Sequence, residues 1–263
     1  MLQNYSNPSA IATNGPEKAK PKHNWWMLLV IPAWVAVCFF TAQLILYGVV
    51  WLLTLLNVSL GIFNQSVINI TLTALIYVIT LVLVIFVPWL IKKYRTTQSD
   101  IGLTRFPNWT DILLTPVGLI AYLILSSVLI LIASWVFPWF NIDQVQDVGF
   151  DQISQRYEYI LAFVTLVVIA PVAEEIIFRG YLYGKLKKYV PIWVAILATS
   201  LLFGAVHGAW NLAIDTFALS VVLCSLREFT GNIWASILLH MVKNGIAFYI
   251  LFIYPTLLTT LGG

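Results

Sequence analysis

The chain has 263 residues, of which 60% are hydrophobic and only 10% are charged, and its formal net charge is +3. A soluble domain carries about 25% charged residues, so the composition excludes a soluble enzyme, a disordered chain and a nucleic-acid-binding protein. Its apolar runs continue for dozens of residues, which also excludes an outer-membrane barrel built from alternating strands. The sequence therefore predicts an all-α fold, a polytopic bundle of transmembrane helices.

The chain begins with a polar segment rich in Asn, Pro and Lys, which predicts a disordered cytoplasmic tail over residues 1–24. We do not expect a secretory signal there, because the apolar run that follows is too long and no small-residue cleavage site closes it. A transmembrane helical domain is predicted for the remainder, residues 25–263.

Two long stretches contain no ionisable side chain other than tyrosine or cysteine, Trp25 to Ile91 and Ile112 to Ile142. A helix needs about 20 apolar residues to cross a bilayer, so the first stretch holds two crossings. The pattern predicts seven crossings in all, at 25–56, 67–91, 112–137, 157–182, 191–209, 211–227 and 231–254. Residues 25–142 contain the uncharged scaffold spans, and residues 157–254 contain the spans of a catalytic core.

Basic residues cluster before the first span, after the second and after the fourth, at Lys18, Lys20, Lys22, Lys92, Lys93, Arg95, Lys185, Lys187 and Lys188. Basic residues gather on the cytoplasmic side of a membrane. We therefore expect a multi-pass protein of the cell membrane, surrounded by lipid, with its N-terminus in the cytoplasm and its C-terminus outside.

Within the predicted spans, Asp, Glu, Lys, Arg and His occur only in the second half of the chain. Those away from the span ends are Glu174, Glu175, Arg179, His207, Asp215, His240 and Lys243. Such residues are rare inside membranes and are candidates for function. Lys243 is expected to snorkel or to pair with a carboxylate such as Asp215. Arg227 and Glu228 are expected to be solvated at the end of a span.

Glu174, Glu175 and Arg179 form the first polar motif. Glu175 and Arg179 are four residues apart and share a helix face, so they can pair, whereas Glu174 is rotated by about 100°. An unpaired carboxylate in apolar surroundings suits a general base. The alternative is a structural ion-pair cluster that includes all three side chains.

Two further motifs repeat the one-turn spacing, Phe203 with His207 and His240 with Asn244. Helical rise allows Glu174, His207 and His240 to meet near the middle of the membrane. Each motif alone also fits a residue that hydrogen-bonds between helices.

Together the three motifs resemble the CPBP family, also called the Abi or type II CAAX prenyl endopeptidase family of intramembrane proteases. The family pattern EExxxR, FxxxH and HxxxN is complete and in order here, over about residues 160–250. The resemblance implies hydrolysis of a peptide bond by water, with Glu174 as general base and His207 holding the water. It implies that His240 and Asn244 donate hydrogen bonds to the oxyanion of the tetrahedral intermediate. It also implies that Glu175 and Arg179 fix the helix and the orientation of Glu174.

The cofactor and the substrate stay open at this point. We favour metal-independent catalysis without a cofactor, but Glu174, His207 and His240 are donors that Zn²⁺ accepts, although no HExxH helix is present. The expected substrate is a peptide or membrane protein, in bacterial processing or bacteriocin immunity. Two alternatives remain: a non-proteolytic membrane scaffold or immunity protein, and a proton-coupled transporter, which usually shows internal repeats that are not seen here.

Overall fold

The computed structural model describes residues 23–58, 64–93, 95–141 and 153–254, and every regular element within these ranges is helical. Most of the predicted tail, residues 1–22, lies outside the described residues. The α-helical elements are α1 (Met27–Leu55), α2 (Gln65–Lys92), α3 (Gln98–Ile101), α4 (Trp109–Val136), α5 (Arg156–Phe163), α6 (Ala170–Glu174), α7 (Gly184–Leu186), α8 (Ile192–Ala205), α9 (Trp210–Thr230) and α10 (Trp234–Phe248). The π-helical elements are η1 (Val164–Ile169), η2 (Glu175–Tyr183) and η3 (Tyr249–Ile253).

All seven predicted spans coincide with helices. In the described part of the chain, five helices are long and apolar enough to cross a membrane: Met27–Leu55, Gln65–Ile91, Trp109–Val136, Arg156–Leu186 and Trp234–Ile253. The other two predicted spans correspond to α8 and α9, and the 14 residues of α8 reach only about 21 Å. The chain is therefore a multi-pass helix bundle, as predicted, with a short helix in its second half.

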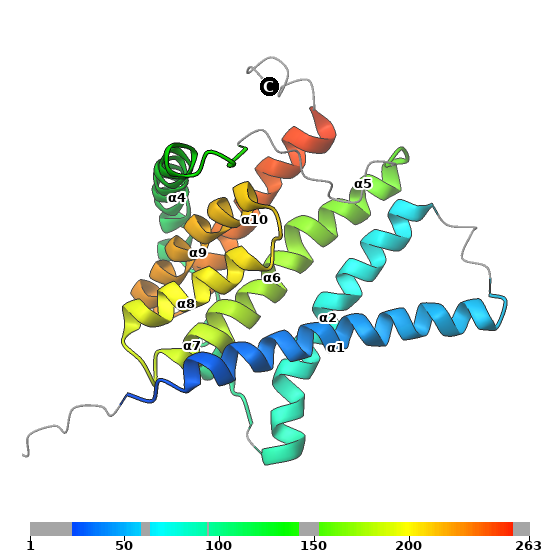
Figure 1. The fold of residues 1–263 in the computed structure, drawn as a ribbon, viewed down its shortest axis with the longest axis horizontal. Coiled ribbons are helices and arrows are strands. Elements are labelled where there is room, and N and C mark those ends of the chain that lie inside the picture. The colour runs from blue at the N-terminus through cyan, green and yellow to red at the C-terminus, as the bar shows by residue number, and fades with distance from the viewer. Residues whose placement is uncertain (1–22, 59–63, 94, 142–152, 255–263) are drawn as a thin grey trace, which may run out of the picture.

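The helix Arg156–Leu186 forms the centre of the bundle. In its most apolar stretch of 18 residues, half of the residues are buried. In the corresponding stretches of α1, α2 and α4, only 22%, 17% and 22% of the residues are buried. It lies between α2 on one side and α8 and α10 on the other, and α1 crosses over α2 (Figure 1). Helix α9 packs against α8, α4 and α10. Many apolar side chains on the outer helices are therefore exposed.

Polar groups at helix starts join elements that are far apart in the sequence. The Asn64 side chain accepts from the Ser66 backbone N–H at 3.1 Å and donates to the Glu158 carboxylate at 3.1 Å. Glu158 also accepts from the backbone N–H groups of Ser154 and Gln155 at 2.7 and 3.0 Å. The free N–H groups at the start of a helix need such acceptors. The same carboxylate therefore fixes the start of α5 against the start of α2.

The prediction that Arg227 is solvated is wrong. Arg227 is only 5% exposed. Its guanidinium lies so close to Gly102 that a Cβ atom on this residue would be only 2.6 Å from it. Glycine at this positive-φ position allows the close approach. The end of α9 is therefore packed against the segment that precedes α4.

Candidate active site

The central helix is irregular where it carries the first motif. Two π-helical stretches, η1 and η2, lie on either side of the short α6. In η1 the Ala170 N–H donates to the Thr165 carbonyl, five residues back. With the same spacing of five residues, the Leu166 carbonyl would accept from the N–H of residue 171. Residue 171 is a proline, which has no N–H. Wide turns of this kind inside α-helices are frequent at functional sites.

Asn244 satisfies the carbonyl that Pro171 leaves without a helical donor. Its Nδ2 donates to the Leu166 carbonyl oxygen at 2.9 Å. An amide carries two N–H groups, so this bond uses one of them. Asn244 therefore joins α10 to the central helix, a contact that sequence reasoning did not predict.

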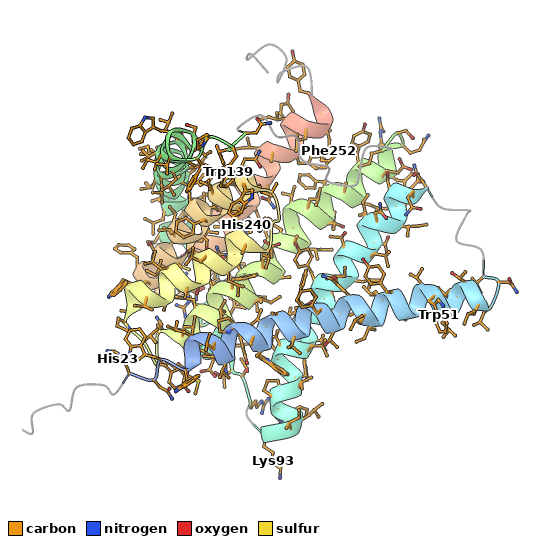
Figure 2. All side chains as sticks on the ribbon, viewed as in Figure 1. His23, Trp51, Lys93, Trp139, His240 and Phe252 are labelled. Carbon is orange, nitrogen blue, oxygen red and sulfur yellow. The ribbon has the colours of Figure 1, made fainter. Side chains whose placement is uncertain are left out.

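Glu175 and Arg179 form the predicted pair, with Arg179 Nη1 2.8 Å from Glu175 Oε1. Both side chains are completely buried. The same carboxylate oxygen accepts from His240 Nδ1 at 2.9 Å. The Arg179 guanidinium also lies over the Phe203 ring, 4.2 Å from its centroid. The three motifs therefore meet inside the bundle, where Figure 2 shows His240.

Glu174 points away from this pair, as the helix geometry predicts, but it has a partner that the sequence did not reveal. Its Oε1 accepts from the Tyr77 hydroxyl of α2 at 2.5 Å. Its Oε2 lies 3.6 Å from His240 Nε2. A single tyrosine in a featureless apolar span carries no motif, and only its contact with Glu174 identifies it.

His207 lies two residues beyond the end of α8, which stops at Ala205. It is still held by the predicted partner, because its Nδ1 donates to the Phe203 carbonyl at 2.6 Å and the two rings are 4.9 Å apart. In a neutral ring this tautomer leaves the lone pair on Nε2. His207 is thus oriented by the turn that ends α8.

Two cavities meet at Glu174 and His207. One, of about 300 Å³, is mostly apolar and is lined on the other side by α1 residues such as Val35 and Phe39. The second, of about 170 Å³, is lined by His240, Lys243 and Asn244 as well. Glu174 and His207 therefore lie between the mostly apolar cavity and the smaller one. We call the smaller one the polar cavity, because polar side chains of α10 stand among its apolar side chains.

Lys243 pairs with Asp215, as expected, with Nζ 3.5 Å from Oδ2. The other carboxylate oxygen accepts from Tyr122 and Ser126 of α4, at 2.7 and 2.6 Å. Hydroxyl donors stabilise a buried carboxylate. The lysine that borders the polar cavity is therefore balanced by an anion that α4 holds in place.

The suggested zinc ligands do not form a ready metal site. Within the described ranges, no three His, Cys, Asp or Glu side chains are gathered so that they could hold a metal ion. Glu174 Oε1 accepts from Tyr77, and the Nδ1 atoms of His207 and His240 bond Phe203 and Glu175. The atoms that would hold an ion are therefore Glu174 Oε2 and the two Nε2 atoms.

Comparison with known proteins supports the family that the three motifs resemble. A family model described as type II CAAX prenyl endopeptidase Rce1-like matches residues 156–246, which confirms the resemblance over this segment. "Uncharacterized protein YpbD" of Bacillus subtilis (strain 168) is 28% identical over 156 residues, 55% of this chain and 77% of that protein.

Two shorter matches fall on about a third of the chain. "Putative membrane peptidase YdiL" of Bacillus subtilis (strain 168) is 30% identical over 84 residues, 32% of this chain and 34% of that protein. An "Uncharacterized 24.3 kDa protein" of Escherichia coli is 30% identical over 89 residues, 32% of this chain and 41% of that protein. The chain thus spans well under half the length of these two relatives. No solved structure matches it.

Proposed function

We propose that the chain is an intramembrane endopeptidase that hydrolyses a peptide bond with water activated by Glu174. The observation that carries this proposal is the position of Glu174 and His207, which line both the apolar and the polar cavity. A general base must lie within reach of the water from which it takes a proton. At this position the base can meet a substrate from one side and water from the other.

In the proposed reaction, Glu174 takes a proton from a water molecule that the Nε2 atom of His207 helps to hold. The resulting hydroxide adds to the carbonyl carbon of the scissile bond. Protonated Nε2 of His240 and the second amide N–H of Asn244 donate to the oxyanion, and each such donor is worth about 10²–10³ in rate. The C–N bond then breaks, and the proton on Glu174 passes to the leaving amine.

Glu175, Arg179 and Tyr77 act as positioning residues. Glu175 accepts from His240 Nδ1 and so fixes the ring that faces Glu174. Arg179 balances the Glu175 charge, and Tyr77 holds one oxygen of Glu174. Preorganised groups of this kind do not have to reorient during the reaction.

The substrate we propose is a peptide or membrane protein with apolar residues beside the scissile bond, processed within a cell membrane. The apolar cavity between α1, α2 and the central helix is suited to such side chains. The relative named as a membrane peptidase supports this substrate class. We further propose that the N-terminus is cytoplasmic, from the distribution of basic residues.

The test compares membrane proteomes, with protein N-termini labelled, of cells that express the wild type, Glu174→Gln or His207→Ala. Glu228→Gln is the matched control, because it removes a carboxylate that bonds Tyr183 and Lys187 outside the cavities. New N-termini should appear with the wild type and with Glu228→Gln, and be absent with both site variants. The same comparison with a chelator in the medium determines whether a metal is required.

Tyr77→Phe sharpens the test, because it removes only the hydroxyl that bonds Glu174. We expect product formation to fall about 10- to 100-fold, as for loss of a hydrogen bond to a charged group. Tyr47→Phe, at an exposed position on α1, should have no effect. If Glu174→Gln and wild-type cells give the same N-termini, the proteolytic proposal is wrong and a scaffold or immunity role is favoured.

A further inference from the structure

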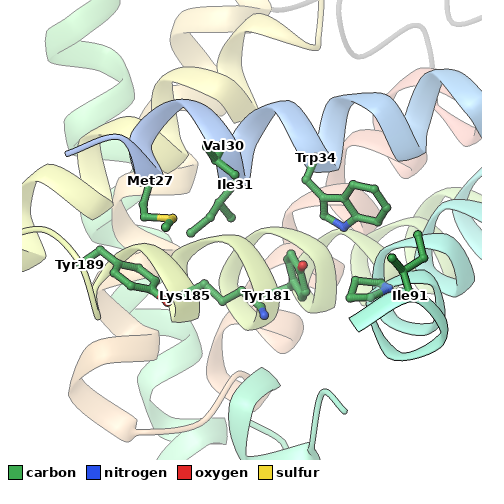
Figure 3. Close-up of a pocket in the computed structure, with 9 residues that line it drawn as sticks. Met27, Val30, Ile31, Trp34, Ile91, Tyr181, Lys185 and Tyr189 are labelled. Atoms are coloured by element: carbon green, nitrogen blue, oxygen red, sulfur yellow. The ribbon is translucent and has the colours of Figure 1, made fainter. Parts of the chain in front are cut away.

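A further cavity lies at the end of the bundle that carries the lysine cluster Lys185, Lys187 and Lys188. It is a groove of about 390 Å³ between α1, the end of α2 and the last turn of the central helix. Figure 3 shows it, with Met27, Ile31 and Trp34 on one wall. Residues of the catalytic motifs do not line it, so it is distinct from the two cavities at Glu174.

The polar side chains that line the groove all carry hydrogen-bond donors. The indole Nε1 of Trp34 is buried and has no hydrogen-bond partner among the described residues, and in Figure 3 it faces across the groove toward Tyr181. Lys185 brings a positive charge to the same groove. A buried donor without an acceptor is destabilising, so the groove is complementary to a ligand that supplies acceptor oxygens.

The rest of the lining is largely apolar and includes Val30, Ile31, Pro88 and Ile91. Helices α1 and α2 supply these four side chains. The groove lies at the end of the apolar spans, where Trp and Tyr side chains meet lipid headgroups. A ligand that fills it needs an anionic head and a hydrocarbon tail. In a membrane, phospholipids have this combination.

We infer that this groove binds one anionic phospholipid, with its phosphate at Lys185 and Trp34 and an acyl chain along α1 and α2. A zwitterionic choline lipid fits less well, because its ammonium would approach Lys185. The Tyr181 ring, to which a choline group could bind, is already covered by Lys185, whose Nζ lies 4.5 Å from the ring centroid.

The bound lipid would join α1 to the helix that carries the first motif. Tyr181 and Lys185 follow Glu174, Glu175 and Arg179 on the same continuous helix, whereas Trp34 belongs to α1. A ligand that binds only the folded state stabilises it by mass action. Lipid binding should therefore raise the thermal stability of the chain, whether or not the chain is a protease.

The test uses the purified full chain in mild detergent, titrated with phosphatidylglycerol, phosphatidylcholine or sodium phosphate, with native mass spectrometry and thermal unfolding as readouts. We expect one phosphatidylglycerol to be retained, about tenfold or more tightly than phosphatidylcholine, and to raise Tm. Lys185→Gln should weaken this binding about tenfold or more, as for loss of a charge-assisted hydrogen bond. Trp34→Phe, which keeps the packing of a ring, should weaken it several-fold.

Matched controls separate the groove from general charge and aromatic effects. Lys187→Gln removes the same charge from a lysine that pairs with Glu228 at 2.6 Å, and Trp193→Phe changes an exposed tryptophan on α8. Neither should alter binding. Equal binding of both lipids, or full binding by Lys185→Gln and Trp34→Phe, overturns the inference. Equal stabilisation by sodium phosphate would show a simple anion site and also overturns it.

Discussion

Replacing Arg179 by methionine tests the buried network that connects the first and third motifs. Arg179 and Glu175 are both completely buried and are 2.8 Å apart. Without the guanidinium, Glu175 would be a buried carboxylate with His240 as its remaining partner. Breaking such a pair from one side costs about 3–5 kcal/mol, so Arg179→Met should lower the free energy of unfolding by about that amount.

The double variant Arg179→Met/Glu175→Gln separates the unpaired charge from other losses. Because it removes both charges, it should recover most of the stability lost in the single variant. The contact between Arg179 and the Phe203 ring is lost in both variants, so it cancels in the comparison. Unfolding in mixed micelles with increasing SDS, followed by tryptophan fluorescence, measures the differences.

Lys187→Met is the matched control for a paired cation. Its partner Glu228 is 2.6 Å away, but the two side chains are 26% and 34% exposed. Partly exposed pairs contribute about 1 kcal/mol or less. If Arg179→Met is no more destabilising than Lys187→Met, or if the double variant loses as much as the single one, the reasoning from the buried pair is refuted.

Three further measurements test the packing of α8 against α9, the polar contacts of Asp215 and the charge of Asp100 in α3. Gly204→Ala places a Cβ atom 2.6 Å from a backbone oxygen of α9 and should cost about 1–3 kcal/mol in the same unfolding assay, whereas Gly48→Ala has no atom within 4 Å and should be neutral or stabilising. Asp215→Asn should destabilise the fold by about 1–3 kcal/mol, and adding Lys243→Met should recover part of that loss, because the lysine is then no longer left without its anion. The pKa of Asp100 is lowered to about 2, mainly by the backbone N–H of Thr97. Since this is below the unfolded value of about 3.9, its stabilising effect is complete above about pH 4 and is lost as the pH falls toward 2. Asp100→Asn should therefore lower Tm at pH 7 but not at pH 2, and an equal loss at both would contradict this assignment.

Local spacing was sufficient to predict contacts within one helix and between neighbouring motifs. The separation of Glu175 and Arg179 by four residues predicted their pair, and the scarcity of charge made Lys243 and Asp215 candidates for each other. Both pairs form in the structure. Such predictions succeed because a helix fixes which residues share a face, and because unpaired charges are unfavourable in apolar surroundings.

Contacts between distant spans could not be predicted in this way. Tyr77 precedes Glu174 by 97 positions in the chain, and nothing in its apolar span distinguishes it from a lipid-facing tyrosine. The bond from Asn244 to Leu166 depends on a π-helical register that opens one carbonyl. Arg227 was expected in solvent because it lies at a helix end, but the neighbouring glycine allows it to be buried.

The sequence by itself determined the all-helical fold, five of the seven predicted spans and the three polar motifs, because composition and helical periodicity are local properties. Only the tertiary structure decided how the motifs combine. It directed Glu174 toward Tyr77 and Glu175 toward His240, and it placed Glu174 and His207 between an apolar and a polar cavity. These outcomes depend on how five or more helices pack together, and that packing is not encoded in the spacing of residues along any one of them.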